Sequence, residues 1–208
     1  VAARGDDATL AVAAARTADV YEDIRRLALD LLVRVAPRGA LEAVEAAAAR
    51  LEDRSAAVRQ AAVEAIAQVV ETSDESMVLA VVRRLEHPDD LVRASALQAL
   101  PAVVPRGGCG IATEAVLDLL SHRNPFARRA ALDALPIVAA RGDRSVVGAV
   151  VPLLKHGDAS LRLRAVKALA RSAPWEDSSV ISMLRDLLED PALQVRRASA
   201  AAIAELEV

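Results

Sequence analysis

Residues 89–100 read Asp-Asp-Leu-Val-Arg-Ala-Ser-Ala-Leu-Gln-Ala-Leu, and related stretches recur along the chain at a nearly fixed interval. Each copy contains one arginine at an equivalent position, and consecutive arginines are 34 or 35 residues apart. An aliphatic residue follows every one of them by seven positions. The six are Arg25, Arg59, Arg93, Arg128, Arg162 and Arg196. Recurrence at this period predicts an array in which each repeat is one supersecondary unit.

The composition favours helices. The 208 residues are 54% hydrophobic, yet the only aromatic residues are Tyr21, Phe126 and Trp175, so small aliphatic side chains must form the core. Alanine is abundant, and it loses almost no side-chain entropy in a helix. The sequence therefore predicts an all-α protein.

Charge and hydropathy narrow the classes of partner. A formal net charge of -3 gives no general attraction to nucleic acid or to anionic membranes. Charged residues interrupt every apolar run before it reaches the roughly 20 residues that cross a bilayer. The single cysteine, Cys109, rules out an internal disulfide and suits a reducing compartment. We expect a soluble protein without a membrane span.

Each repeat is predicted to form two helices joined by a short loop. Between residues 41 and 69, apolar residues recur at spacings of three and four in two stretches, which Ser55 separates. Ser55 is a favourable N-cap, the residue just before the first helical turn, and the equivalent position in other repeats holds Asp89, Asn124 and Asp158. In the last repeat the same role is predicted for Asp190, followed by Pro191.

One helix pair cannot bury its apolar face alone, so neighbouring pairs must stack. We expect a single domain, 1–208, that forms a right-handed α-solenoid of about six helical hairpins. Their approximate ranges are 7–38, 40–72, 75–106, 111–141, 145–175 and 178–208. The first six residues are identical to residues 138–143, which close an internal repeat. The array is therefore expected to be part of a longer one.

The repeat motif resembles one helical-repeat family. Tetratricopeptide repeats have a similar period, but they need aromatic residues where this chain has alanine or leucine, and the Thr-Pro-Leu-His motif of ankyrin repeats is absent. Leu-Glu-Asp followed by Val-Arg-x-Ala-Ala in 51–66, and its counterparts in 85–100 and 188–200, are similar to HEAT repeats. They look most like the short HEAT-like variety, which includes phycobilisome lyases. The resemblance implies a scaffold, adaptor or transport receptor, and only rarely a catalyst.

The six aligned arginines have two interpretations. They could line a groove for an acidic partner, or each could bind acidic and carbonyl groups of adjacent loops and hold the stack together. The resemblance to HEAT repeats implies the second, structural role. The next position is basic only at Arg26, Arg129 and Arg197, and acidic residues interrupt the basic ones along the second helices. A phosphate backbone would need an unbroken basic path, so nucleic acid is not the expected partner.

No catalytic, cofactor or metal site is predicted. His87, His122 and His156 occupy equivalent loop positions, but neighbouring repeats are about 10 Å apart, too far for shared zinc ligation. Asp53 and Asp190 hold the same position in other repeats, which suggests a polar loop residue of either type. We therefore expect a protein that is not an enzyme.

Two aromatic residues and one linker stand out. Phe126 in a hairpin loop and Trp175 in a linker should be partly exposed, and each either contacts a partner or folds back on its own loop. Cys109 lies in the one linker that is a residue longer than its counterparts. Either the extra residue is a neutral insertion in a surface loop, or the loop presents Cys109 as a reactive thiol. Pro101 and Pro136 fall inside second helices and are expected to kink them.

The sequence thus predicts a non-catalytic scaffold or adaptor that presents a concave helical face to a protein. The candidate contact residues are Arg26, Phe126, Arg129, Trp175 and Arg197. Two alternatives stay open. One is a structural subunit of a large assembly, and the other, implied by the lyase-like resemblance, is the handling of a chromophore or another ligand.

Overall fold

A computed structural model of the chain describes residues 6–71 and 75–207. Every regular element in these residues is an α-helix or a short 3-10 helix, and none is a strand, which confirms the all-α prediction. The chain divides into two compact units, here named unit 1 (1–105) and unit 2 (106–208). The prediction of a single domain with six repeat ranges stays a prediction. The duplicated stretch at residues 1–5 and the repeat ends at 72 and 208 lie outside the described residues.

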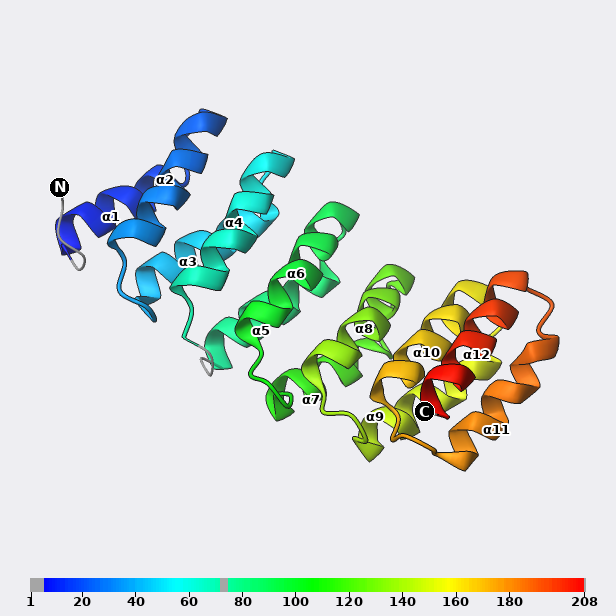
Figure 1. Cartoon of the computed structure of the whole chain (residues 1–208). Coiled ribbons are helices and arrows are strands. Elements are labelled where there is room, and N and C mark those ends of the chain that lie inside the picture. Colours follow the sequence, from blue (N-terminus) through cyan, green and yellow to red (C-terminus); the bar gives the residue numbers. More distant parts are fainter. Residues whose placement is uncertain (1–5, 72–74, 208) are drawn as a thin grey trace. The chain divides into compact units, whose positions relative to one another are not determined.

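Unit 1 contains two layers of helices (Figure 1). The first helices of its hairpins are α1 (Asp7–Arg16), α3 (Leu41–Ala49) and α5 (Glu75–Arg83), and the second helices are α2 (Glu22–Val35), α4 (Ala56–Val69) and α6 (Asp90–Val103). The 3-10 turns η1 (Arg50–Glu52) and η2 (Arg84–Glu86) follow α3 and α5. Helix α4 packs between α2 and α6, and α3 contacts both α1 and α5.

Unit 2 repeats this arrangement. Its first helices are α7 (Gly110–Leu119), α9 (Arg144–Val150) and α11 (Ser178–Asp186), with η3 (Val151–Lys155) and η4 (Leu187–Glu189) after the last two. Its second helices are α8 (Pro125–Val138), α10 (Ala159–Ser172) and α12 (Leu193–Leu206). Helix α10 packs against both α8 and α12, and these three helices form the second-helix layer of unit 2 (Figure 1).

Small residues let the second helices approach one another closely. The position three residues after each aligned arginine is buried throughout, with an exposed fraction of at most 4%. Its occupants are Ala28, Ala62, Ala96, Ala131, Ala165 and Ser199. Leucines and isoleucines such as Leu32, Ile66 and Leu135 fill the space between the two helices of a hairpin and are fully buried. The core of the described residues is therefore built from alanine, valine, leucine and isoleucine, and the three aromatic side chains are exposed.

The predicted helix starts are found at four positions and differ at one. The side chains of Ser55, Asp89, Asn124 and Asp158 accept backbone N–H groups of the first helical turn. Helix α12 instead begins at Leu193, with Ala192 as its N-cap and no side-chain cap. Asp190 is not available as that cap, because its carboxylate accepts the N–H of Ala192 and hydrogen bonds from Nε and Nη2 of Arg162.

One loop position explains why aspartate and histidine interchange. The residue six before each aligned arginine uses its side chain to accept the backbone N–H two residues later, at 2.8–3.1 Å. The six residues are Asp19, Asp53, His87, His122, His156 and Asp190. A carboxylate oxygen and an imidazole Nδ1 reach equally far from the backbone, so either type closes the turn. This is the polar loop role that the sequence suggested.

The aligned arginines hold these loops. In every repeat the Nη1 of the arginine donates to the carbonyl of that loop residue and to the next carbonyl, at 2.6–3.2 Å. Two of the arginines also form bidentate pairs with the aspartate of the following hairpin. Arg25 binds Asp53 at 2.7 and 2.8 Å, and Arg162 binds Asp190 at 2.7 and 2.9 Å.

The linkers between hairpins form a second recurring contact. The backbone N–H of Gly39, Cys109, Gly142 and Glu176 donates to the carbonyl of the last residue of the following second helix, at 2.7–2.8 Å. The longer linker fits because Gly108, at φ +96°, lies flat against the chain at Ala140. Any Cβ on Gly108 would lie 2.7 Å from the Ala140 nitrogen, so this residue is packed rather than free on the surface.

Candidate functional site

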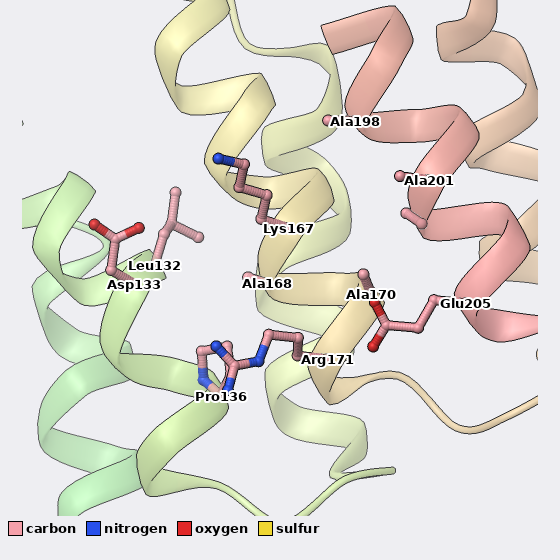
Figure 2. Close-up of a pocket in the computed structure, with 11 residues that line it drawn as sticks. Leu132, Asp133, Pro136, Lys167, Ala168, Ala170, Arg171, Ala198, Ala201 and Glu205 are labelled. Carbon is pink, nitrogen blue, oxygen red and sulfur yellow. The ribbon is translucent and has the colours of Figure 1, made fainter. Parts of the chain in front are cut away.

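A groove lies on the second-helix layer of unit 2, with a volume of about 360 Å³. Figure 2 shows its lining from α8, α10 and α12. The residues that line it are Leu132, Asp133, Pro136, Lys167, Ala168, Ala170, Arg171, Ala198, Ala201, Ala202 and Glu205. The groove is open to solvent along the surface of this layer.

Small side chains make the hollow. Ala168 and Ala202 lie six residues after their aligned arginines, at a buried position where the helices meet. Ala201 is exposed, and the equivalent position in other repeats holds a longer residue, such as Glu64 or Asp133. Because α12 has only a methyl group there, the space beside Lys167 stays open. The floor is therefore apolar and shallow.

The two acidic residues of the groove are already paired. Asp133 forms an ion pair with Arg164, and Glu205 lies 3.4 Å from Arg141. Lys167 and Arg171 are exposed, and neither forms an ion pair or a side-chain hydrogen bond within the described part of the chain. Figure 2 shows Arg171 extending from α10 toward Pro136, whereas the Glu205 carboxylate points from α12 toward α10. The groove thus offers two cations to a ligand.

Trp175 lies at one end of the groove, near Glu205. The guanidinium of Arg141 stacks over the indole, 3.7 Å from the ring centroid, and also donates to the carbonyl of Ala173 at 3.0 Å. Because Arg141 pairs with Glu205 as well, it fixes the indole next to the end of α12. The indole nevertheless stays 54% exposed, as expected from the sequence. Because stacking already holds the indole in place, the Trp175 side chain loses less conformational entropy when it contacts a partner.

Phe126 and Arg129 lie on the same face of α8 as Asp133, since the three residues are spaced by three and four. Phe126 is 52% exposed, which agrees with the prediction, and the Arg129 guanidinium lies 5.6 Å from its ring. Arg129 also donates to Asp158 at 2.7 Å. That hydrogen bond, together with the backbone N–H of Ser160, lowers the pKa of Asp158.

The other two predicted contact residues lie in different units. Arg197 is exposed on α12, one turn before Ala201, and has no ion pair within the described residues. Arg26 lies on α2 of unit 1, where its closest acidic group is that of Asp23 at 4.0 Å. Four of the five predicted residues thus belong to the unit that holds the groove, and their role in binding stays a prediction.

Sequence reasoning missed Lys167 and Arg171 as site residues. The sequence predicts that acidic residues at equivalent positions, Asp133 among them, interrupt the basic ones. In the structure Arg164 pairs with Asp133, so Asp133 does not neutralise Lys167. The available signal was the spacing of four between Lys167 and Arg171, which places both on one face of α10.

No group of three or more His, Cys, Asp or Glu side chains in 6–71 and 75–207 is arranged to hold a metal ion. No helix there is long and apolar enough to cross a membrane. The three histidines accept backbone N–H groups through Nδ1, which gives each a structural function.

The fold and the groove define a helical-repeat protein of the α-solenoid class. Within that class, residues 112–204 match the family model described as HEAT repeats, which confirms the predicted resemblance. No curated protein sequence matches the chain.

Solved structures share the fold. A HEAT-like repeats protein from the archaeon Thermococcus onnurineus NA1 is 16% identical, with a TM-score of 0.54, and the match covers 97% of this chain and 88% of that one. A designed armadillo repeat protein in complex with the peptide (KR)4 is 17% identical, with a TM-score of 0.51 and coverage of 95% and 99%. An engineered protein is 18% identical, with a TM-score of 0.51 and coverage of 95% and 96%. At these identities the likeness shows the fold alone.

Proposed function

We propose that this protein is a non-catalytic interaction scaffold that binds a partner protein on the second-helix layer of unit 2. The observation that supports this function is the groove itself, an apolar floor beside two exposed cations that no residue of the described chain pairs. Water solvates both cations in the free protein, and beside an apolar floor they are placed to attract a partner with complementary charge.

The repeat fold favours a binding role over an enzymatic one. Repeat proteins of this class present extended surfaces to other macromolecules, and the designed armadillo neighbour was solved with a peptide bound. A protein partner fits better than nucleic acid, because the two cations do not continue into an unbroken basic path and the floor of the groove has no aromatic side chain.

Affinity capture from the native source, followed by mass spectrometry and an absorbance spectrum of the eluate, tests this proposal. The double variant Lys167→Glu/Arg171→Glu and the single variants Trp175→Ala and Arg129→Glu should each lose partner, with helicity unchanged by circular dichroism. The matched control is Lys155→Glu/Arg144→Glu, which reverses two exposed charges outside the groove. A partner retained equally by all variants would contradict the proposal. A bound pigment without a partner protein would favour the chromophore alternative instead.

A permanent structural subunit is the second candidate, and one observation favours it. The first hairpin of unit 1 exposes several apolar side chains, among them Val20 at 76% and Leu27 at 62%. Extensive apolar contact persists in high salt, whereas binding to Lys167 and Arg171 weakens. Washing the captured complex with 1 M salt separates the two candidates: retention favours the subunit, and release favours the groove.

A further inference from the structure

The groove has the charge and the spacing of a site for one class of ligand. Lys167 and Arg171 are one helical turn apart, so their attachment points are separated by about 6 Å along α10. In an extended peptide, side chains at alternate positions lie on one side of the chain at a separation of about 7 Å. Two carboxylates at alternate positions of an extended peptide therefore match the two cations.

We infer that the groove binds an extended acidic peptide segment, with carboxylates at alternate positions and small residues between them. This inference rests on the proposed function and specifies the partner of the same site. Lys167 and Arg171 each bind one carboxylate, and the alanines of α10 and α12 accept only small side chains beside them. A helix, which is 10–12 Å across with its side chains, would not settle into so shallow a hollow.

The surroundings reinforce the preference for acidic ligands. Arg197 adds a third unpaired cation on α12, two turns before Glu205. The carboxylates of Asp133 and Glu205 are held by Arg164 and Arg141, so they repel an acidic ligand less than free carboxylates would. The surface is thus positive here although the whole chain has a net charge of -3.

The composition of the chain permits a direct test. Lys155 and Lys167 are its only lysines, and Lys155 lies on η3, where it lines a different hollow with Met183 and Leu187. A carbodiimide joins a peptide carboxylate to a nearby amine as an amide. Lys167 therefore reports binding in the groove, and Lys155 is an internal control in the same molecule.

The probe is a capped, fluorescent peptide, Gly-Ala-Glu-Ala-Glu-Ala-Gly, and its control has glutamine in place of both glutamates. We expect the acidic peptide to bind at least about fivefold more tightly at low salt than the glutamine peptide, and Lys167→Glu/Arg171→Glu to abolish that difference. Crosslinking should modify Lys167 in preference to Lys155. Equal binding of both peptides, or equal crosslinking of both lysines, would overturn the inference.

A further comparison separates a failure of this inference from a failure of the proposed scaffold function. If neither peptide binds but capture of the native partner still depends on Lys167 and Arg171, the acidic-segment inference is wrong and the scaffold function stands. If partner capture is also indifferent to these residues, both are wrong. An oligothymidylate that competes with the peptide at equal or lower concentration would show that the site takes nucleic acid, which also overturns the inference.

Discussion

Gly108 is the residue on which the longer linker depends. It combines a positive φ with contact to the backbone at Ala140, so alanine there meets both a steric clash and an unfavourable backbone conformation. We predict that Gly108→Ala lowers the free energy of unfolding by more than about 2 kcal/mol. Gly107→Ala is the matched control, because its φ is +97° but no atom lies within 4 Å of the added Cβ. Urea unfolding of both variants measures the difference, and equal losses would show that the contact does not matter.

Glu176 lies at a linker position that is glycine in two other linkers. Its φ is +56°, and its N–H donates to the carbonyl of Leu206, as Gly39 and Gly142 donate to the ends of their following helices. The left-handed conformation costs a residue with a Cβ about 1 kcal/mol. Glu176→Gly should therefore raise the free energy of unfolding by about 0.5 kcal/mol, since added backbone entropy in the unfolded state offsets part of the gain. Chemical denaturation tests the sign, and a clear loss of stability would mean that the Glu176 side chain has a favourable role of its own.

At the scale of helices, the pair between Arg162 and Asp190 joins two consecutive hairpins of unit 2. Both side chains are largely buried, and removing the charge of Asp190 leaves a buried cation with only carbonyl partners. Asp190→Asn retains the acceptor for the Ala192 N–H, so it isolates the charge. We predict a loss of about 2–3 kcal/mol in the free energy of unfolding. Asp158→Asn, at a pair with Arg129 that is only partly buried, should cost less by the same measurement.

The same pair makes stability depend on pH. The hydrogen bond from Arg162 lowers the pKa of Asp190, and although burial raises the pKa of Asp53, the hydrogen bonds from Arg25 and Ser55 outweigh it. A carboxyl whose pKa is lower in the folded state stabilises the fold above its unfolded pKa of about 3.9, and this contribution disappears as the pH falls through the folded value. The stability gap between the wild type and Asp190→Asn should therefore be constant from pH 7 to about 4 and narrow below it. Urea titrations across that range test this, and a gap that widened in acid would contradict it.

At the scale of the whole molecule, stability should be local. A repeat protein is stabilised by each repeat and by its contacts with direct neighbours, so damage in one place does not spread evenly. We predict that Asp190→Asn lowers amide hydrogen-exchange protection in α10 and α12 while α2 and α4 keep theirs. Hydrogen exchange with peptide-level mass spectrometry measures this. Equal loss throughout the described helices would mean that the two units unfold together.

The sequence by itself determined the fold class, because periodic features are visible without coordinates. The spacing of the arginines from Arg25 to Arg196 defined the repeats, and Ser55, Asp89, Asn124 and Asp158 marked helix starts through contacts that span only two or three residues. Partial exposure of Phe126 and Trp175 was expected from loop positions, and both side chains are exposed, although Phe126 is the second residue of α8 rather than part of the loop.

Only the tertiary structure decided which charges are free. Asp133 and Arg164 are 31 residues apart in the chain, and Arg141 and Glu205 are 64 residues apart. Their pairing leaves Lys167 and Arg171 unpaired beside a floor of alanine. A periodic pattern shows which residues recur on one face of a helix, but the partner of each charge lies on a neighbouring helix. The packing of α8, α10 and α12 therefore had to be known before the groove could be recognised.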